Sequence, residues 1–311
     1  MMRAWALVFT WAVLADTAAF AGEVGEYDEV SVSPPPDTAM KTVSVENDLG
    51  SVVIVGHDSD EVVVRARKRA PDADTLQRLS VALTPAASGV LEVRTELLSG
   101  LEQTIARAGS VGVDLEIAVP RHVRPSVKVW KGHVRVEQID NGAEVLANEA
   151  NVDFRQVSGR IRSHSTLGRQ QFRELVQVTL ESLALEGDLA FRDVQGDALT
   201  AFTHRGEISA TGLVVRKLNL RTFRGPIRLV GVLAKDGHYD IASVHGDIEF
   251  SFADIRNTPA VVIAESDAGH LLLPDGFDRQ VVSVAPGTPR VALRSRLGDV
   301  RVAIIQGLAP L

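Results

Sequence analysis

Apolar and polar residues alternate along the C-terminal two-thirds of the chain in a pattern that repeats about every 19 residues. Small residues mark the repeat, at intervals of 18, 18, 19, 19 and 19 residues that later lengthen to 21, 23 and 29. Positions two and four after each mark are mostly apolar, and the positions between them are mostly polar. Because successive side chains of a strand point to opposite faces, this pattern predicts short strands with one buried face. The marks are Gly132, Ala150, Gly168, Gly187, Gly206, Gly225, Gly246, Gly269 and Gly298.

A unit of two short strands cannot bury its apolar side alone, so successive units must stack. Stacking at about 4.8 Å places equivalent residues of successive coils above one another. Phe154, Phe172 and Phe191 each stand four positions after a mark and are expected to form an internal aromatic ladder. The sequence therefore predicts an all-β fold, a parallel β-solenoid in which each coil lies on its predecessor.

Two features of the repeat predict turns. The marking glycines are expected to supply the positive φ that a tight corner requires. Ser or Thr stands three positions before most marks, as at Ser165, Thr203 and Thr222, and should form a hydroxyl ladder at that corner. Second turns are expected about nine residues before the marks, at Gly142, Gly159, Gly196 and Gly237.

Four parts are expected along the chain. Residues 1–21 form a signal peptide, 22–38 an extended linker, 39–122 an N-terminal β-rich region or cap, and 123–311 the solenoid repeat domain. Within the N-terminal region, residues 47–50 predict a hairpin-like or a solenoid turn, and residues 71–80 predict one short helix.

The first 21 residues have the three features of a cleaved export signal. Arg3 supplies the positive charge, residues 4–15 form an apolar run, and Ala19-Phe20-Ala21 gives a small-x-small cleavage site before Gly22. A membrane-spanning helix needs about 20 apolar residues, and this run stops at Asp16. We therefore expect an exported protein of the periplasm or cell surface, with no membrane span after cleavage.

Composition excludes several kinds of chemistry. The chain has 33 Lys and Arg against 40 Asp and Glu, a net charge of −7, which argues against a nucleic-acid partner because phosphate binding needs a surplus of cations. It has no cysteine, so disulfides, thiol catalysis, thiolate metal sites and a lipoprotein anchor are all excluded.

The run of alternating residues 113–120, followed by 127–136 and by Ser158-Gly-Arg-Ile161, resembles a large bacterial family known as "putative adhesin", a domain of unknown function. Residues 43–54 resemble the opening strands of that family. The resemblance covers about residues 40–305. It implies an exported β-solenoid, and it supplies no catalytic motif.

Motifs that carry chemistry are missing from the sequence. The eight histidines show no compact metal-ligand spacing, and they are interpreted as surface residues near turns. Neither a serine-hydrolase Gly-x-Ser-x-Gly nor a phosphate-binding Gly-rich loop is present. The sequence therefore predicts no catalytic, cofactor-binding or metal-binding residue and no cofactor. The histidines are His57, His122, His133, His164, His204, His238, His245 and His270.

The strongest enzymatic alternative is a column of carboxylates one position after the marks, which includes Asp188, Glu207, Asp247 and Asp299. Neighbouring coils would place two of them about 5 Å apart, and alternate coils about 10 Å. Such separations are close to those of glycosidases. Against catalysis, the column lies at a solvated turn beside arginines, and few aromatic residues are available to hold a sugar because the stacked Phe residues point inward.

The leading hypothesis is a non-enzymatic envelope or cell-surface protein, an adhesin-like binding or structural module. Its solenoid would present a rigid flank to an unidentified protein or polysaccharide partner. One alternative is a polysaccharide lyase or hydrolase that uses Asp188, Glu207 or Asp247. Another is an accessory protein of envelope-stress signalling.

Overall fold

The structure, a computed structural model, describes residues 24–32, 40–86, 89–97, 111–253, 260–274 and 287–305. Contacts divide the chain into two compact units, Met1–Val152 and Asp153–Leu311, which we call the N-terminal and the C-terminal unit. The predicted signal peptide, residues 1–21, lies outside the described residues. The boundary at residue 123, where the repeat domain is predicted to start, stays a prediction.

In the N-terminal unit, a long strand is enclosed by strands that come later in the sequence. Strand β2 (Thr42–His57) pairs in parallel with β7 (Arg124–Ile139), and this register places Gly50 opposite Gly132. On its other edge, β2 pairs with β5 (Val90–Leu97) and β6 (Gly112–Pro120). The turn at residues 47–50 is therefore a solenoid turn, one of the two predicted alternatives.

Further elements extend this unit. Strand β1 (Val24–Val32) pairs antiparallel with β3 (Val62–Ala70), so this part of the predicted linker is a strand of the sheet. The predicted short helix is α1 (Ala73–Leu76), where the Asp72 carboxylate accepts a hydrogen bond from the backbone N–H of Thr75 at 2.7 Å. The other strands are β4 (Leu79–Ala86) and β8 (Ala143–Val157), the second of which continues past Val152.

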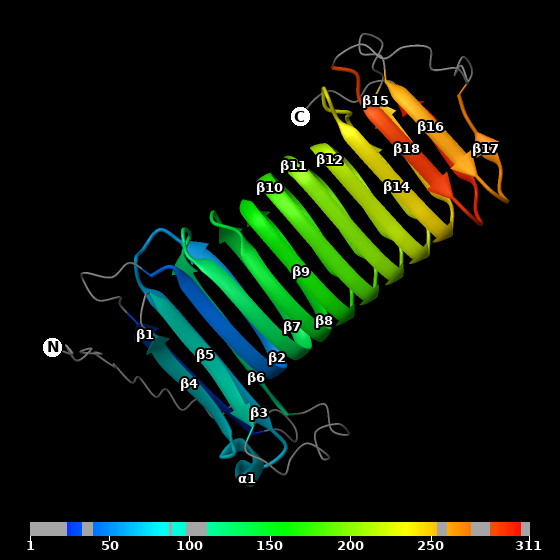
Figure 1. The fold of residues 1–311 in the computed structure, drawn as a ribbon. Helices are drawn as coiled ribbons and strands as arrows, with labels where there is room; N and C mark the ends of the chain where they lie inside the picture. Colours follow the sequence, from blue (N-terminus) through cyan, green and yellow to red (C-terminus); the bar gives the residue numbers. More distant parts are fainter. Residues whose placement is uncertain are drawn as a thin grey trace. The chain divides into compact units, whose positions relative to one another are not determined.

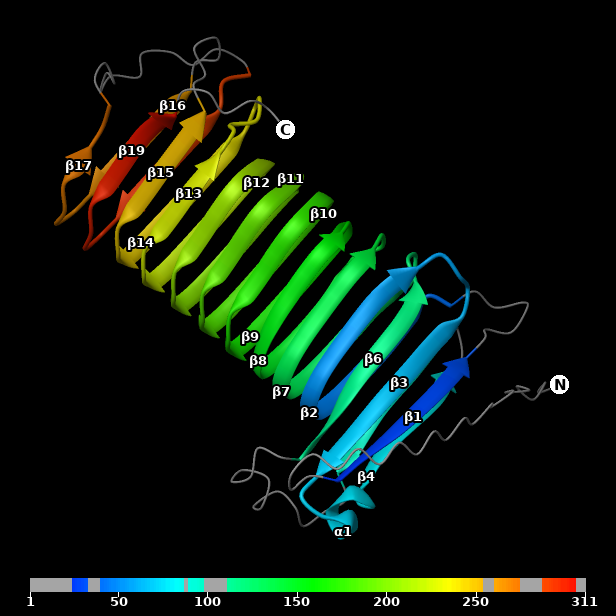
Figure 2. The same ribbon diagram turned by 180° about the vertical axis from the view of Figure 1, so that it is seen from behind.

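The C-terminal unit is a two-layered stack of coils (Figures 1 and 2). Strand β12 (Ile208–Arg224) pairs with β13 (Ile227–Gly231) through its first half and with β14 (His238–His245) through its second half. Each long strand therefore bends from one layer into the other. We call the layer that contains β14 the front layer and the layer that contains β13 the rear layer. The remaining strands are β9 (Gly159–Leu167), β10 (Gln170–Glu186), β11 (Leu189–Arg205), β15 (Ile248–Ala253), β16 (Val261–Ser266), β17 (Leu271–Leu272), β18 (Arg290–Ser295) and β19 (Val300–Ile305).

The predicted internal ladder is confirmed. The rings of Phe154 and Phe172 stack with centroids 5.2 Å apart, and those of Phe172 and Phe191 stack at 4.9 Å, in both cases nearly parallel. All three are buried, and the parallel pairing of β10 with β11 places Phe172 opposite Phe191. The all-β, solenoid-like fold class that the 19-residue period predicts is therefore correct.

The prediction that each coil lies on its predecessor is wrong at the C-terminal end. Strand β18 pairs with both β14 and β16, and β19 pairs with both β15 and β17. The coil formed by residues 290–305 thus lies between two coils that precede it in sequence. This order leaves the short β16 and the two-residue β17 at the edge of the stack among the described strands. Short edge strands offer little template for unwanted pairing.

The marking glycines allow neighbouring coils to approach each other closely. Gly206 and Gly225 have positive φ, as predicted, and a Cβ on either would overlap the carbonyl oxygen of the preceding mark. The predicted column of Ser and Thr hydroxyls is present, but its hydroxyls donate to these carbonyl oxygens and not to one another. Thr203 donates to Gly187 at 3.0 Å and Thr222 to Gly206 at 3.3 Å.

The second corner is formed by different residues from those predicted in the middle of the stack. Gly142 and Gly159 have positive φ, but Gly196 and Gly237 do not. The residues with positive φ at this corner lie earlier in each coil. Here the chain passes from one layer to the other through a bulge and not through a glycine turn. They are Gln156, Glu174, Asp193 and Gly212.

Candidate functional site

The predicted acidic column exists, and its carboxylates bind backbone groups at the turns. Asp188 accepts a hydrogen bond from the backbone N–H of Glu207 at 3.0 Å, and Asp247 accepts one from Asp299 at 2.9 Å. Asp299 in turn accepts from the backbone N–H of His270 at 2.8 Å. Each of these aspartates therefore caps the turn of the coil stacked upon it.

Backbone groups and cations surround the carboxylates of this column. The backbone N–H of His270 holds the pKa of Asp299 below its ordinary value. Glu207 accepts a hydrogen bond from Arg228 at 2.5 Å, and Asp188 forms an ion pair with Arg169 at 3.3 Å. These carboxylates therefore already have partners at the turns and in the neighbouring coils.

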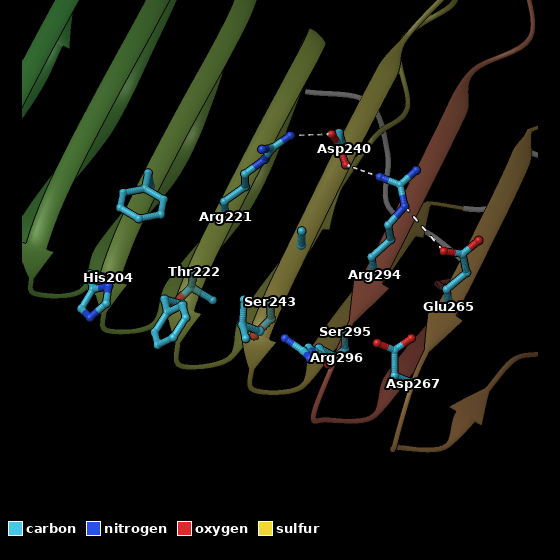
Figure 3. Close-up of a pocket in the computed structure, with 14 residues that line it drawn as sticks. His204, Arg221, Thr222, Asp240, Ser243, Glu265, Asp267, Arg294, Ser295 and Arg296 are labelled. Carbon is cyan, nitrogen blue, oxygen red and sulfur yellow. Dashed lines mark hydrogen bonds and ion pairs between the residues drawn. The ribbon is translucent and has the colours of Figure 1, made fainter.

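An open groove lies on the outer face of the front layer (Figure 3). It has a volume of about 480 Å³ and is lined by outward-facing side chains of β11, β12, β14, β18 and β16. A second depression of about 730 Å³ covers the other ends of these strands and shares Asp240 and Arg294 with the first. Together they form one surface, which we call the front groove.

An ion-pair network crosses the middle of the front groove (Figure 3). One oxygen of Asp240 lies 3.1 Å from Arg221, and the other lies 3.3 Å from Arg294. Arg294 also lies 3.6 Å from Glu265. These side chains are between one-third and two-thirds exposed, so each pair contributes little to stability, about 0–1 kcal/mol. The network thus presents charged groups to solvent in fixed positions.

Aromatic side chains lie at the turn end of the front groove. The rings of His204 and Phe223 stack in parallel with centroids 4.8 Å apart, and His245 meets Phe223 edge-on at 5.6 Å. The guanidinium of Arg224 lies 5.9 Å from the centre of the Phe223 ring. Phe202 is 38% exposed beside them. This cluster offers flat apolar surface beside charged groups.

The sequence analysis did not predict Phe202 and Phe223 as residues of a binding surface, because it considered only the stacked Phe residues that point inward. The signal was present in the repeat, because Phe202 and Phe223 flank Thr203 and Thr222 of the hydroxyl column. Those threonines are buried, so the adjacent positions must face outward. His204 and His245 lie near the turn as predicted, and Phe223 lies in contact with both.

A column of basic residues lies at the other end of the front groove. Lys217 is opposite His238, and His238 is opposite Arg290, on three successive strands of the front layer. All three side chains are exposed and line the depression. Among the described residues, neither Lys217 nor Arg290 has an ion-pair partner.

Two further sites were sought among the described residues. No group of three His, Asp or Glu side chains in this part of the chain is placed to hold a metal ion. The helix that the structure describes has four residues, and none there is long and apolar enough to cross a membrane.

Comparisons with known proteins identify the family of the repeat. Residues 117–267 match the Toastrack DUF4097 family, which confirms the resemblance to a bacterial domain of unknown function. No curated protein matches the chain.

Three crystal structures are similar to the chain at 9–11% sequence identity. One is a "putative adhesin" from Bacteroides fragilis, with a TM-score of 0.40 over 92% of this chain and 98% of that one. A "putative cell adhesion protein" from Clostridium sporogenes scores 0.32 over 90% and 100%. A "putative lipid binding protein" from Parabacteroides distasonis scores 0.34 over 90% and 96%.

Proposed function

We propose that this chain, which carries a Toastrack DUF4097 domain over residues 117–267, is a non-catalytic binding protein of the bacterial cell envelope. The observation that carries the proposal is the front groove. Its lining comes from five strands of one parallel stack, so the backbone ladder holds its side chains at fixed spacing. A surface of this kind suits an extended polymer that contacts several coils at once.

The form of the groove supports binding in preference to catalysis. It is open, and two of its three carboxylates, those of Asp240 and Glu265, form ion pairs with arginines. Exposed aromatic rings adjoin the charged groups, as in many recognition surfaces where flat rings supply contact area at low entropic cost.

Binding is tested with the purified full chain and a panel of labelled neutral and acidic polysaccharides, measured by fluorescence polarisation. We expect at least one polymer to bind, and we expect Phe223→Ala to weaken binding about tenfold because it removes the ring between His204 and His245. The matched control is Val176→Ala, which shortens an exposed apolar side chain outside the groove. Absence of binding to every polymer would contradict the proposal.

The enzymatic alternative is tested on the same mixtures by measuring polymer length before and after incubation. We expect no shortening by the full chain or by Asp188→Asn and Glu207→Gln, because both carboxylates serve turn contacts. Shortening that either substitution abolishes would replace the binding proposal with the lyase or hydrolase alternative.

The envelope location follows from the export signal expected in residues 1–21. We expect protein recovered from the periplasm or cell surface of a bacterial host to begin at Gly22, as measured by mass spectrometry of the intact chain. Recovery of uncleaved protein from the cytoplasm alone would contradict this part of the proposal.

A further inference from the structure

We infer that the front groove binds an acidic polysaccharide, whose carboxylates are held by the basic column of Lys217, His238 and Arg290. This inference rests on the proposed binding function and names the class of ligand. Its basis is that two cations of the groove, Lys217 and Arg290, form no ion pair with another described residue.

Elsewhere in this unit, many charges that face each other across neighbouring coils are opposite, although Arg173 faces Arg192 and Arg205 faces Arg224. Arg162 pairs with Glu181 at 3.5 Å, and Glu186 pairs with Arg205 at 2.7 Å. On the rear layer one run alternates from Glu207, in the turn before β12, through three strands that carry Arg228, Glu249 and Arg301. Opposite charges in these positions stabilise strand pairing, and like charges destabilise it.

The basic column breaks this alternation. The register places Lys217, His238 and Arg290 side by side on β12, β14 and β18, and neighbouring strands of a sheet lie about 4.8 Å apart. The nearest carboxylate along β14 is that of Asp240, whose two oxygens are directed at Arg221 and Arg294. Neither Lys217 nor Arg290 forms an ion pair with another described residue, so an anionic ligand would supply a partner to both.

The front groove as a whole also carries more positive than negative side chains. Its lining contains five Lys and Arg residues but only three Asp and Glu, on a chain with a net charge of −7. A positively charged surface attracts an anion locally, even though the net charge of the protein is negative. The cations are Lys217, Arg221, Arg290, Arg294 and Arg296, and the acids are Asp240, Glu265 and Asp267.

The other groups in the groove favour a carbohydrate anion. Glu265 and Asp240 repel phosphates, but they accept hydrogen bonds from sugar hydroxyls, as do the side chains of Asn219 and Thr200 nearby. The rings of His204 and Phe223 provide a flat face for the C–H surface of a sugar ring. A sugar acid carries both a carboxylate for Lys217 and Arg290 and several hydroxyls for Asp240 and Glu265, whereas a nucleic acid has few hydroxyls to offer beside its phosphates.

The decisive probe is polygalacturonate, an unbranched polymer of a sugar carboxylate, compared with its methyl ester, which has the same backbone without the charge. We expect the purified full chain to bind polygalacturonate about tenfold more tightly than the ester at low salt, with the difference shrinking as salt screens the charges. The double variant Lys217→Gln/Arg290→Gln should lose about tenfold in affinity for the acid and little for the ester.

The control is Arg192→Gln/Arg301→Gln, which removes the same charge from exposed residues of the rear layer. Equal losses in the two double variants would overturn the inference, since long-range charge alone would then explain binding. Binding of the ester as tight as that of the acid would also overturn it while leaving the proposed function intact. Preferred binding of single-stranded DNA or of anionic lipid vesicles, measured in parallel, would assign the column to a phosphate ligand instead.

Discussion

The hydroxyl of Thr203 donates a hydrogen bond to the carbonyl oxygen of Gly187, which lies 3.0 Å away in the neighbouring coil. The same bond recurs from Ser243 to Gly225 at 3.2 Å and from Ser295 to Gly246 at 3.0 Å. This bond links the column of marking glycines to the column of Ser and Thr residues. The glycine lets the coils approach closely, and the hydroxyl of the next coil donates to the glycine's carbonyl oxygen.

Replacing the hydroxyl tests this link. We expect Thr203→Val to lower the free energy of unfolding by about 1–3 kcal/mol, because it keeps the shape of the buried side chain but leaves the Gly187 carbonyl without this donor. Denaturant unfolding followed by circular dichroism measures the change. Thr200→Val, at an exposed position of the same strand, is the control and should change stability by less than about 0.5 kcal/mol.

Adding a methyl group to the glycine column tests the close approach of the coils. We expect Gly206→Ala to destabilise the protein by about 1–3 kcal/mol, because its Cβ would overlap the carbonyl oxygen of Gly187. The control is Gly25→Ala in β1, where a Cβ would make an ordinary contact 3.5 Å from the nearest atom. Equal stability of the two variants in denaturant would show that the coils do not approach as described.

The aromatic ladder offers a test of the core. We expect Phe172→Ala to lower the free energy of unfolding by about 3–5 kcal/mol, because the ring is fully buried between Phe154 and Phe191. Phe202→Ala, on the exposed face, should cost less than about 1 kcal/mol. If the two alanine variants unfold at the same denaturant concentration, the inward and outward assignments are wrong.

Acid sensitivity of the N-terminal unit should depend on Asp114. Burial alone would raise the pKa of Asp114, but the N–H and hydroxyl of Ser51 and the guanidinium of Arg69 outweigh it and hold this pKa below 3.8. The native state therefore binds this proton less readily than the unfolded state. Its contribution to stability is complete well above pH 3.8 and is lost as pH falls through the lowered value.

The measurement is the free energy of unfolding between about pH 6 and pH 2. We expect Asp114→Asn to be less stable than the original chain at pH 6 and to lose less stability on acidification. Parallel pH profiles for the two proteins would show that the carboxylate has no such role.

The repeating corner and the internal Phe ladder could be predicted because both are local consequences of the sequence. A period of about 19 residues and strict alternation specify which side chains face inward, and a slip of one residue would expose every apolar position. The same alternation predicts that Phe202 and Phe223 face outward, although their meeting with His204 and His245 depends on which coils are neighbours.

Only the tertiary structure decided the order of the coils at the end of the stack. Nothing in a periodic pattern distinguishes a coil that lies on its predecessor from one that inserts between two earlier coils, as residues 290–305 do, because each offers the same buried face. The basic column also depends on which coils are neighbours in the tertiary structure. Lys217, His238 and Arg290 are separated by 20 and more residues and adjoin through inter-strand pairing, which long-range hydrogen bonding and packing select.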